Sequence, residues 1–219
     1  MIAHTLPPLR VVPHLFTTAD LCAGNVVLDF VNTAAGLNRD PRDWLDGYAR
    51  LVMWAELAGV CDVELARDLA ALDRANPAGG EDALAQARLL RSALYELIHA
   101  GREGVRPPGR AIDELQRWCR RGGSAVELRW EADGALRTSL RSCGLQVISV
   151  AVAFAAADLL SRPIGGRFGV CAGHNCGWVF LDTSKSHRRR WCDMKTCGNA
   201  AKASRHYQRH RPIASQSIK

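Results

Sequence analysis

The sequence lacks the segments that mark membrane-bound or exported proteins. Its longest apolar run, from Val147 to Ala157, is too short to span a bilayer, because a spanning helix needs about 20 apolar residues. The N-terminal residues do not combine a basic segment with an apolar one, so we expect no signal peptide. We therefore predict a cytoplasmic protein with no membrane partner.

Signatures of the common enzyme classes are also missing. The sequence holds no G-x-S-x-G nucleophile elbow, no P-loop, no Rossmann glycine fingerprint and no H-E-x-x-H metal motif. We therefore predict that the protein is not an enzyme.

A disulfide framework is not expected, although the chain has 8 cysteines. Cytoplasmic thiols are kept reduced, and four of the cysteines are scattered with no common spacing. We expect these four to be small buried apolar residues: they are Cys22, Cys61, Cys119 and Cys143.

Acidic residues are scarce in one region only. Residues 162–219 hold 12 Lys and Arg against 2 Asp, a net charge of +10, whereas residues 1–161 hold 17 basic and 20 acidic residues, a net charge of −3. The hydrophobic content of 47% is that of a globular protein. This asymmetry predicts a polyanionic partner for the C-terminal region and not for the body of the protein.

Hydrophobic periodicity predicts a mostly helical body with one β-hairpin. Val26 to Thr33 is short and apolar, and its length does not decide between a strand and a buried helix. Val126, Leu128 and Trp130 alternate with polar residues before a turn, which is typical of a hairpin. We expect helices at Asp40 to Gly59, Asp62 to Ala75, Glu81 to Ala100, 110–121 and Gln146 to Ser161, the last in the centre of the core.

The four tryptophans of this body are predicted to be core residues, because three lie on expected helix faces and one on a strand face. They are Trp44, Trp54, Trp118 and Trp130. On the fourth helix, Ile112, Leu115 and Trp118 are expected to point inward.

The remaining four cysteines form two C-x4-C pairs, Cys171 with Cys176 and Cys192 with Cys197. Two such pairs supply the four soft thiolates that a tetrahedral Zn²⁺ prefers. Gly173 and Gly177 give the first pair the backbone freedom to aim N–H groups at the sulfurs. We predict one structural zinc in a treble-clef-like finger, with a zinc ribbon as the second choice and with His174 and His187 outside the ligand set.

Basic residues surround these cysteines and continue into an expected helix after Cys197. A rigid, positively charged loop and helix suit contact with nucleic-acid phosphates. The predicted contact residues are Lys185, Arg188, Arg189, Arg190, Lys195, Lys202, Arg205 and Arg209.

The fold class that follows is α+β: a mostly helical N-terminal domain with a β-hairpin, plus a small zinc finger. The linker Pro163-Ile164-Gly165-Gly166 marks the boundary. We assign residues 1–162 to the N-terminal domain, 167–211 to the finger and 212–219 to a flexible tail.

Several motifs resemble a known family. Trp178 to Ser184, Arg189 to Met194, and Cys197-Gly198-Asn199 with Lys202 beyond it are similar to the CGNR zinc finger. Leu28-Asp29-Phe30-Val31-Asn32-Thr33, and the segment from Asp46 to Gly59 with Trp54, resemble the ABATE domain that accompanies this finger.

The resemblance implies a bacterial, stress-associated transcription regulator with a DNA-binding finger, whose zinc ligands fall on the four paired cysteines. One position departs from the pattern, because Ala200 stands where the signature has arginine. The neighbouring arginines Arg188 to Arg190 are candidates to compensate.

The leading hypothesis is a regulator that binds DNA through the finger, while the N-terminal domain senses a small-molecule effector or forms a homodimer. Alternatives are an RNA- or ribosome-associated zinc protein and a protein-interaction adaptor with an acidic partner. Asp29 and Asn32 are weak candidates for a ligand site, since such residues more often cap a helix.

Overall fold

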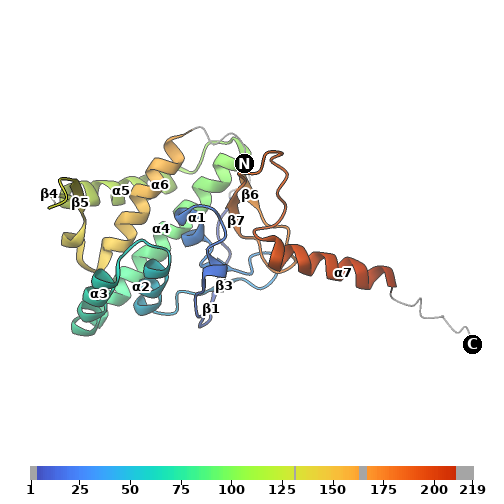
Figure 1. Ribbon diagram of the computed structural model, residues 1–219, viewed down its shortest axis with the longest axis horizontal. Coiled ribbons are helices and arrows are strands. Elements are labelled where there is room, and N and C mark those ends of the chain that lie inside the picture. The colour runs from blue at the N-terminus through green and yellow to red at the C-terminus, as the bar shows by residue number, and fades with distance from the viewer. Residues whose placement is uncertain (1–3, 131, 163–166, 211–219) are drawn as a thin grey trace, which may run out of the picture.

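The computed structural model describes residues 4–130, 132–162 and 167–210, with the side chains of Arg209 and His210 excepted. A helical body and a β-hairpin occupy one end of the molecule, the cysteine-rich finger lies at the other end, and a final helix projects away from both (Figure 1). The α+β class with a zinc-finger region is confirmed. The predicted linker at residues 163–166 and the predicted tail at residues 212–219 lie outside the described residues.

The body contains six α-helices within this part of the chain. They are α1 (Val26–Val31), α2 (Tyr48–Leu57), α3 (Val63–Ala75), α4 (Pro77–Glu103), α5 (Gly109–Ala125) and α6 (Val147–Ser161). Short strands β1 (Arg10–Val11), β2 (Ala34–Ala35) and β3 (Arg42–Asp43) form a three-stranded sheet in the order β1-β3-β2. The 3-10 segments are η1 (Thr18–Asp20) and η2 (Arg141–Gln146), and the hairpin consists of β4 (Glu127–Trp130) and β5 (Leu136–Ser139).

The finger follows with β6 (Phe168–Val170), β7 (Val179–Leu181), the short π-helical segment η3 (Met194–Gly198) and α7 (Asn199–His210). Helix α4 is the central element of the body, because α1, α5, α6 and β6 all contact it. Its buried face includes Leu90, Leu94 and Ile98. One hydrophobic core runs from this face into the finger, where Phe168, Val179 and Phe180 are buried.

Local sequence signals set several helix ends as expected. The Asp62 carboxylate accepts a hydrogen bond of 2.7 Å from the N–H of Leu65 and begins α3. Asn76 ends α3 as expected, but its side chain also caps α4, which begins at Pro77 and not near Glu81 as predicted. The ambiguous segment Val26 to Thr33 begins as a helix, α1, capped by Asn25. The hairpin and the central apolar helix α6 also lie where they were predicted.

The helix predicted to begin at Asp40-Pro41 instead begins at Tyr48. Tertiary pairing overrides the local signal, because Arg42 and Asp43 are held in β3 between a parallel strand and an antiparallel one. The Asp40 carboxylate accepts hydrogen bonds from Arg10 and Arg42 and does not cap a helix.

Of the four scattered cysteines predicted to be buried, Cys61 is buried, whereas Cys22, Cys119 and Cys143 are only partly buried.

Two further core predictions are wrong. Trp130 is 73% exposed on the hairpin, and Ile112 is exposed on α5. Trp54 and Trp118 are buried as expected. Trp44 is partly buried outside any helix, where it stacks on His14 with ring centroids 3.6 Å apart. The alternating pattern therefore identified a hairpin but not a buried face of it.

The segment Arg141–Ser161 is long and apolar enough to cross a membrane by length and composition. Gly144 interrupts it with φ 56° and ψ −135°. Beyond this break, α6 contacts α1, α4 and α5 and buries Val150 and Ala153. Because a core helix of a globular protein passes the same test, the segment is weak evidence for a membrane span.

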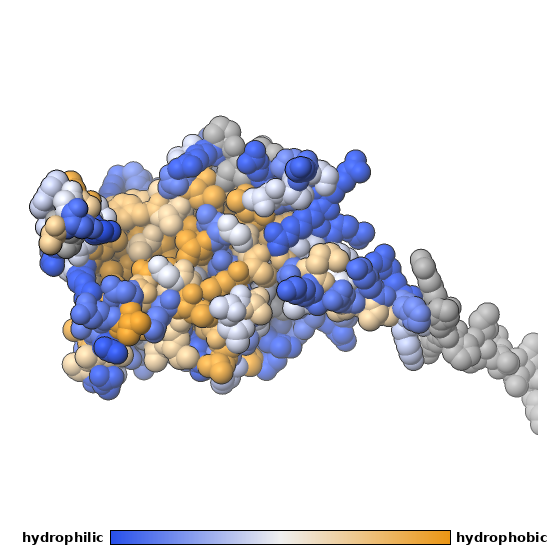
Figure 2. Space-filling view, in the orientation of Figure 1, coloured by the Kyte–Doolittle hydropathy of each residue, from blue (hydrophilic) through white to orange (hydrophobic). Residues whose placement is uncertain are grey.

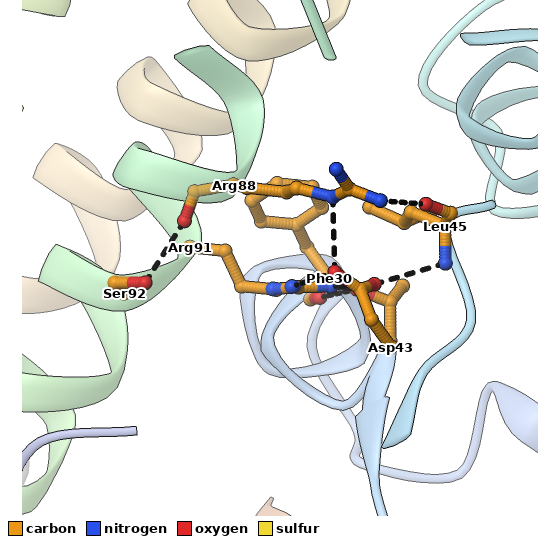
Figure 3. Close-up of polar contacts among 7 residues, drawn as sticks. Phe30, Asp43, Leu45, Arg88, Arg91 and Ser92 are labelled. Carbon is orange, nitrogen blue, oxygen red and sulfur yellow. Dashed lines mark hydrogen bonds and ion pairs between the residues drawn. The ribbon is translucent and has the colours of Figure 1, made fainter. Parts of the chain in front are cut away.

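A buried ion-pair cluster fixes β3 to α4 (Figure 3). The Arg91 guanidinium, 2% exposed, donates to both oxygens of the Asp43 carboxylate at 2.8 and 2.7 Å and to the Thr33 hydroxyl at 2.9 Å. Arg88 lies 2.9 Å from the same carboxylate and also donates to the carbonyl of Leu45. Burial alone would raise the pKa of Asp43, but Arg91, the N–H of Leu45 and Arg88 together outweigh burial and hold that pKa below its usual value. The chain between Thr33 and Asp43 is therefore anchored at both ends.

Candidate metal centre and basic surface

The four paired cysteines come together at the junction of β6, β7 and η3. Cys171 directly follows β6, and Cys176 lies three residues before the start of β7. Cys192 precedes η3, and Cys197 lies within it, two residues before the start of α7. A turn between two strands and a second pair that opens into a helix is the treble-clef-like arrangement predicted. The zinc ribbon fits less well, because the second pair lies on no hairpin.

The sulfur geometry fits a tetrahedral zinc ion. The four Sγ atoms all lie within 4.8 Å of one another. Cys192 Sγ lies 3.6 Å from Cys176 Sγ and 3.7 Å from Cys197 Sγ. Zinc–sulfur bonds of about 2.3 Å in a tetrahedron place the sulfurs about 3.8 Å apart. The predicted cofactor, one structural zinc, is therefore confirmed as the match to this cluster.

The four thiols lie close enough to shift one another's pKa values. Hydrogen bonds from Cys176 and Cys192 hold the pKa of Cys171 below its usual value, and the same contact with Cys171 raises the pKa of Cys192. A divalent ion stabilises four adjacent thiolates together, because its charge offsets their repulsion. Zinc binding is thus expected to release protons and to fold this segment.

Two glycines make the turn between Cys171 and Cys176 possible, as predicted. The N–H of Gly173 points at Cys171 Sγ, 3.4 Å away. A Cβ at Gly173 would lie 2.9 Å from Cys176 Cβ and 3.0 Å from Cys197 Sγ, too close for any side chain. Gly177 has φ 79°, a left-handed conformation that favours glycine.

The anchored segment between Thr33 and Asp43, which belongs to the body, forms hydrogen bonds to the Cys171–Cys176 turn. The N–H of Leu37 donates to the carbonyl of Cys176 at 2.8 Å. The Asn38 amide donates to the carbonyls of Cys171 and Gly173 at 3.2 and 2.6 Å. Arg39 donates to His174 Nε2 at 2.7 Å, so His174 supports the turn and is no part of the sulfur cluster. No motif in the sequence indicated this role for residues 37–39.

Asn32, a weak ligand candidate, joins the body to the finger. Its amide donates to the carbonyl of Val179 and accepts from the N–H of Val179, both at 2.9 Å. Both bonds are buried, so the side chain is used in fixing α1 to β7.

Asp29, the other weak candidate, accepts a hydrogen bond of 3.0 Å from the N–H of Ala23. Its burial raises the pKa of the carboxyl to about 6, against the lowering effect of that bond. Neither residue lines a described cavity of the finger.

Arg189 does not extend outward with its two neighbours. Its guanidinium donates to the carbonyls of Trp191, Cys22 and Cys192 and lies 4.5 Å from the centre of the Phe180 ring. Its backbone N–H donates to Asp182. The side chain is therefore occupied in closing the loop over the finger, which leaves Arg188 and Arg190 as the exposed arginines of the three.

Six of the predicted nucleic-acid contact residues are exposed cations on the loop, η3 and α7, and Arg188 is one of them. The other five are Lys185, Arg190, Lys195, Lys202 and Arg205. The side chain of Arg209 lies outside the described residues. We call these six exposed residues the basic surface. Figure 2 shows hydrophilic residues gathered over α7 and the adjoining finger, in contrast to the apolar stretches of the body.

A groove of about 760 Å³ lies between the Cys171–Cys176 turn and α7. Its wall on α7 is made of small residues, Ala200, Ala201 and Ser204. Trp191, Arg190 and Arg205 lie along it, and the Arg190 guanidinium is 5.4 Å from the Trp191 ring centre. Ala200, the departure from the family signature, therefore lines this groove.

Comparison with protein families agrees with both regions. A model of the ABATE family, described as "Putative stress-induced transcription regulator", matches residues 24–163, more than half of the chain. The chain belongs to the ABATE family. A second model, the CGNR zinc finger, matches residues 167–210 and so includes all four paired cysteines. In a comparison with curated proteins, none matches this ABATE protein.

Proposed function

We propose that this ABATE protein regulates transcription by binding DNA through the CGNR finger. The observation that carries the proposal is the basic surface, a set of exposed cations on a loop and helix fixed by the zinc site. Rigid cations of one sign suit phosphate contact, and α7 projects from the molecule as an element able to lie against a duplex. The N-terminal domain would sense an effector or dimerise, in a cytoplasmic, nucleoid-associated protein.

The test compares two triple variants of equal charge change. Arg188→Ala/Arg190→Ala/Arg205→Ala removes cations of the basic surface and spares Arg189, whose side chain closes the loop. Arg67→Ala/Arg74→Ala/Arg120→Ala removes exposed arginines from α3 and α5 in the body. Both proteins are loaded with zinc, and duplex binding is measured as a function of salt.

We expect the first variant to bind more weakly and to lower the salt dependence, the slope of log K against log salt, by about one unit for each phosphate that the protein no longer neutralises. The body variant should retain the wild-type slope. Equal effects of the two variants would show that the basic surface does not bind the duplex.

The groove beside Trp191 favours RNA as a second candidate. Single-stranded RNA is commonly recognised by stacking unpaired bases on aromatic side chains. Competition between duplex DNA and structured RNA for the zinc-loaded protein separates the two. Retardation of neither at low salt would instead favour an adaptor with an acidic protein partner.

A further inference from the structure

The β4–β5 hairpin stands apart from the finger and from the core. Figure 1 places it at the end of the molecule opposite β6, β7 and α7. Its two strands pack mainly against each other and little against the other described elements. A two-stranded hairpin in water is marginally stable at best, and a third strand or a covering helix is what usually stabilises it.

One face of the hairpin is apolar and uncovered. The register pairs Leu128 with Thr138 and Trp130 with Leu136, so these four side chains share a face. Leu128 is 64% exposed, Trp130 73% and Leu136 59%. Uncovered apolar residues of this size on a free strand edge are typical of a protein interface.

The opposite face is charged, and two arginines lie next to each other on it. Arg129 lies directly across from Arg137 in the register, which places two like charges side by side. Glu127 forms an ion pair of 3.0 Å with Arg129 along the same strand. Arg137 forms its own ion pair with Asp133 of the turn. The free edge of β4 therefore presents one acidic and one basic side chain, Glu127 and Arg129, two residues apart.

We propose that β4 pairs antiparallel with β4 of a second copy of this chain, in a symmetric four-stranded sheet centred on Leu128. In this register Leu128 faces Leu128 of the second copy. Glu127 faces Arg129, and Arg129 faces Glu127, so two opposite-charge pairs form. Val126, extended and 40% exposed, comes opposite Trp130 and lengthens the apolar face.

Other registers of the same pairing bring unfavourable neighbours together. A shift of one residue places charged side chains on the apolar face, because side chains alternate along a strand. A shift of two residues places Glu127 opposite its own copy in one direction and Arg129 opposite its own copy in the other. Pairing through β5 offers no acid to Arg137 within that strand. The charges of β4 thus select one register.

The measurement is sedimentation of the zinc-loaded, full-length protein, with no nucleic acid present. A small interface of this kind is weak, so we expect a monomer–dimer equilibrium in the micromolar range. Leu128→Asp places like charges at the symmetry axis and should make the protein monomeric. Unchanged far-UV circular dichroism and zinc content would show that the fold is intact, since the hairpin lies outside the core.

Charge reversal provides the sharper test. Glu127→Arg alone and Arg129→Glu alone each turn both opposite-charge pairs into like-charge pairs, and each should weaken the dimer about tenfold or more. The double variant Glu127→Arg/Arg129→Glu restores opposite charges and should restore the dimer. An equimolar mixture of the two single variants should form the heterodimer in preference to either homodimer.

A monomeric wild-type protein throughout the micromolar range would overturn the proposal. So would charge-reversed single variants that dimerise like the wild type, or a mixture with no heterodimer by native mass spectrometry. Because the assay contains no nucleic acid, each of these outcomes leaves the proposed DNA binding untouched.

Discussion

The two ends of the molecule differ in how a small β-hairpin is stabilised. Each carries a two-stranded β-hairpin, which is too small to bury a core of its own. The β6–β7 hairpin is stabilised by a four-thiolate metal site and by packing of Phe168 and Phe180 into the body. The β4–β5 hairpin has no comparable support among the described residues, and its apolar side chains are exposed. The difference is that the zinc site and the body stabilise one hairpin, whereas the apolar face of the other is uncovered.

The finger is nevertheless bonded directly to the body. Hydrogen bonds from Asn32 to Val179 and from Asn38 to Cys171 cross between the two family regions. We therefore expect loss of the metal to destabilise the body near α1 and to have little effect on the distant β4–β5 hairpin.

The largest expected effect is that of removing the metal. Cys192→Ser, or chelation of the wild-type protein, should unfold β6, β7 and η3, because structural zinc contributes about 10–16 kcal/mol to the folding of small zinc domains. Hydrogen exchange should show reduced protection in the finger and in α1, whereas α3 and α5 should keep their protection. Cys119→Ser, outside the cluster, is the matched control. Full protection of the finger without metal would contradict this expectation.

Breaking the buried ion pair should have the next largest effect. Asp43→Ala leaves the Arg91 guanidinium buried without its carboxylate, a change that typically costs about 3–5 kcal/mol. Denaturant unfolding measures this loss, and zinc competition should show weaker binding, because residues 37–39 lose their anchor. Asp68→Ala, at an exposed pair with Arg141, is the control and should cost under about 1 kcal/mol.

Asn32→Ala should weaken the junction between the two regions. It removes two buried hydrogen bonds and leaves the N–H and C=O of Val179 without those partners, at a cost of about 2–4 kcal/mol. Chemical denaturation with zinc present gives the value. Asn25→Ala, which removes the cap of α1 but no contact with the finger, should cost only about 1 kcal/mol. Similar losses of unfolding free energy for Asn32→Ala and Asn25→Ala would show that the effect comes from α1 and not from the junction.

The smallest effect depends on pH. Burial raises the pKa of Asp29 from 3.8 to about 6, so the folded state favours the protonated acid. This contribution is complete below pH 3.8 and is lost as pH rises through about 6. Asp29→Asn retains the oxygen that accepts from Ala23 and should be the more stable protein at neutral pH, by up to about 3 kcal/mol. The advantage should grow as the pH rises from about 4 to about 6 and level off above that. A difference in unfolding free energy that does not change with pH would show that ionisation of Asp29 is not its cause.

Much of the fold could be predicted because its signals are local. Asp62 caps α3 by a hydrogen bond to the N–H of Leu65, three residues away, and Asn76-Pro77 ends that helix. The four cysteines form two pairs whose spacing can be read directly from the sequence. The start of α2 could not be predicted in this way. Asp40-Pro41 is a good local cap signal, but pairing of Arg42 and Asp43 with strands from elsewhere prevents a helix there.

The candidate site divides in the same manner. The sequence alone determined the metal ligands, their glycines and the excess of positive charge near them, since each depends on residues close together in the chain. Only the tertiary structure decided that Arg189 turns inward, that residues 37–39 hold the metal turn, and that Trp130 is exposed. These outcomes depend on contacts between residues as far apart as Asn32 and Val179, and no local pattern encodes which of them will meet.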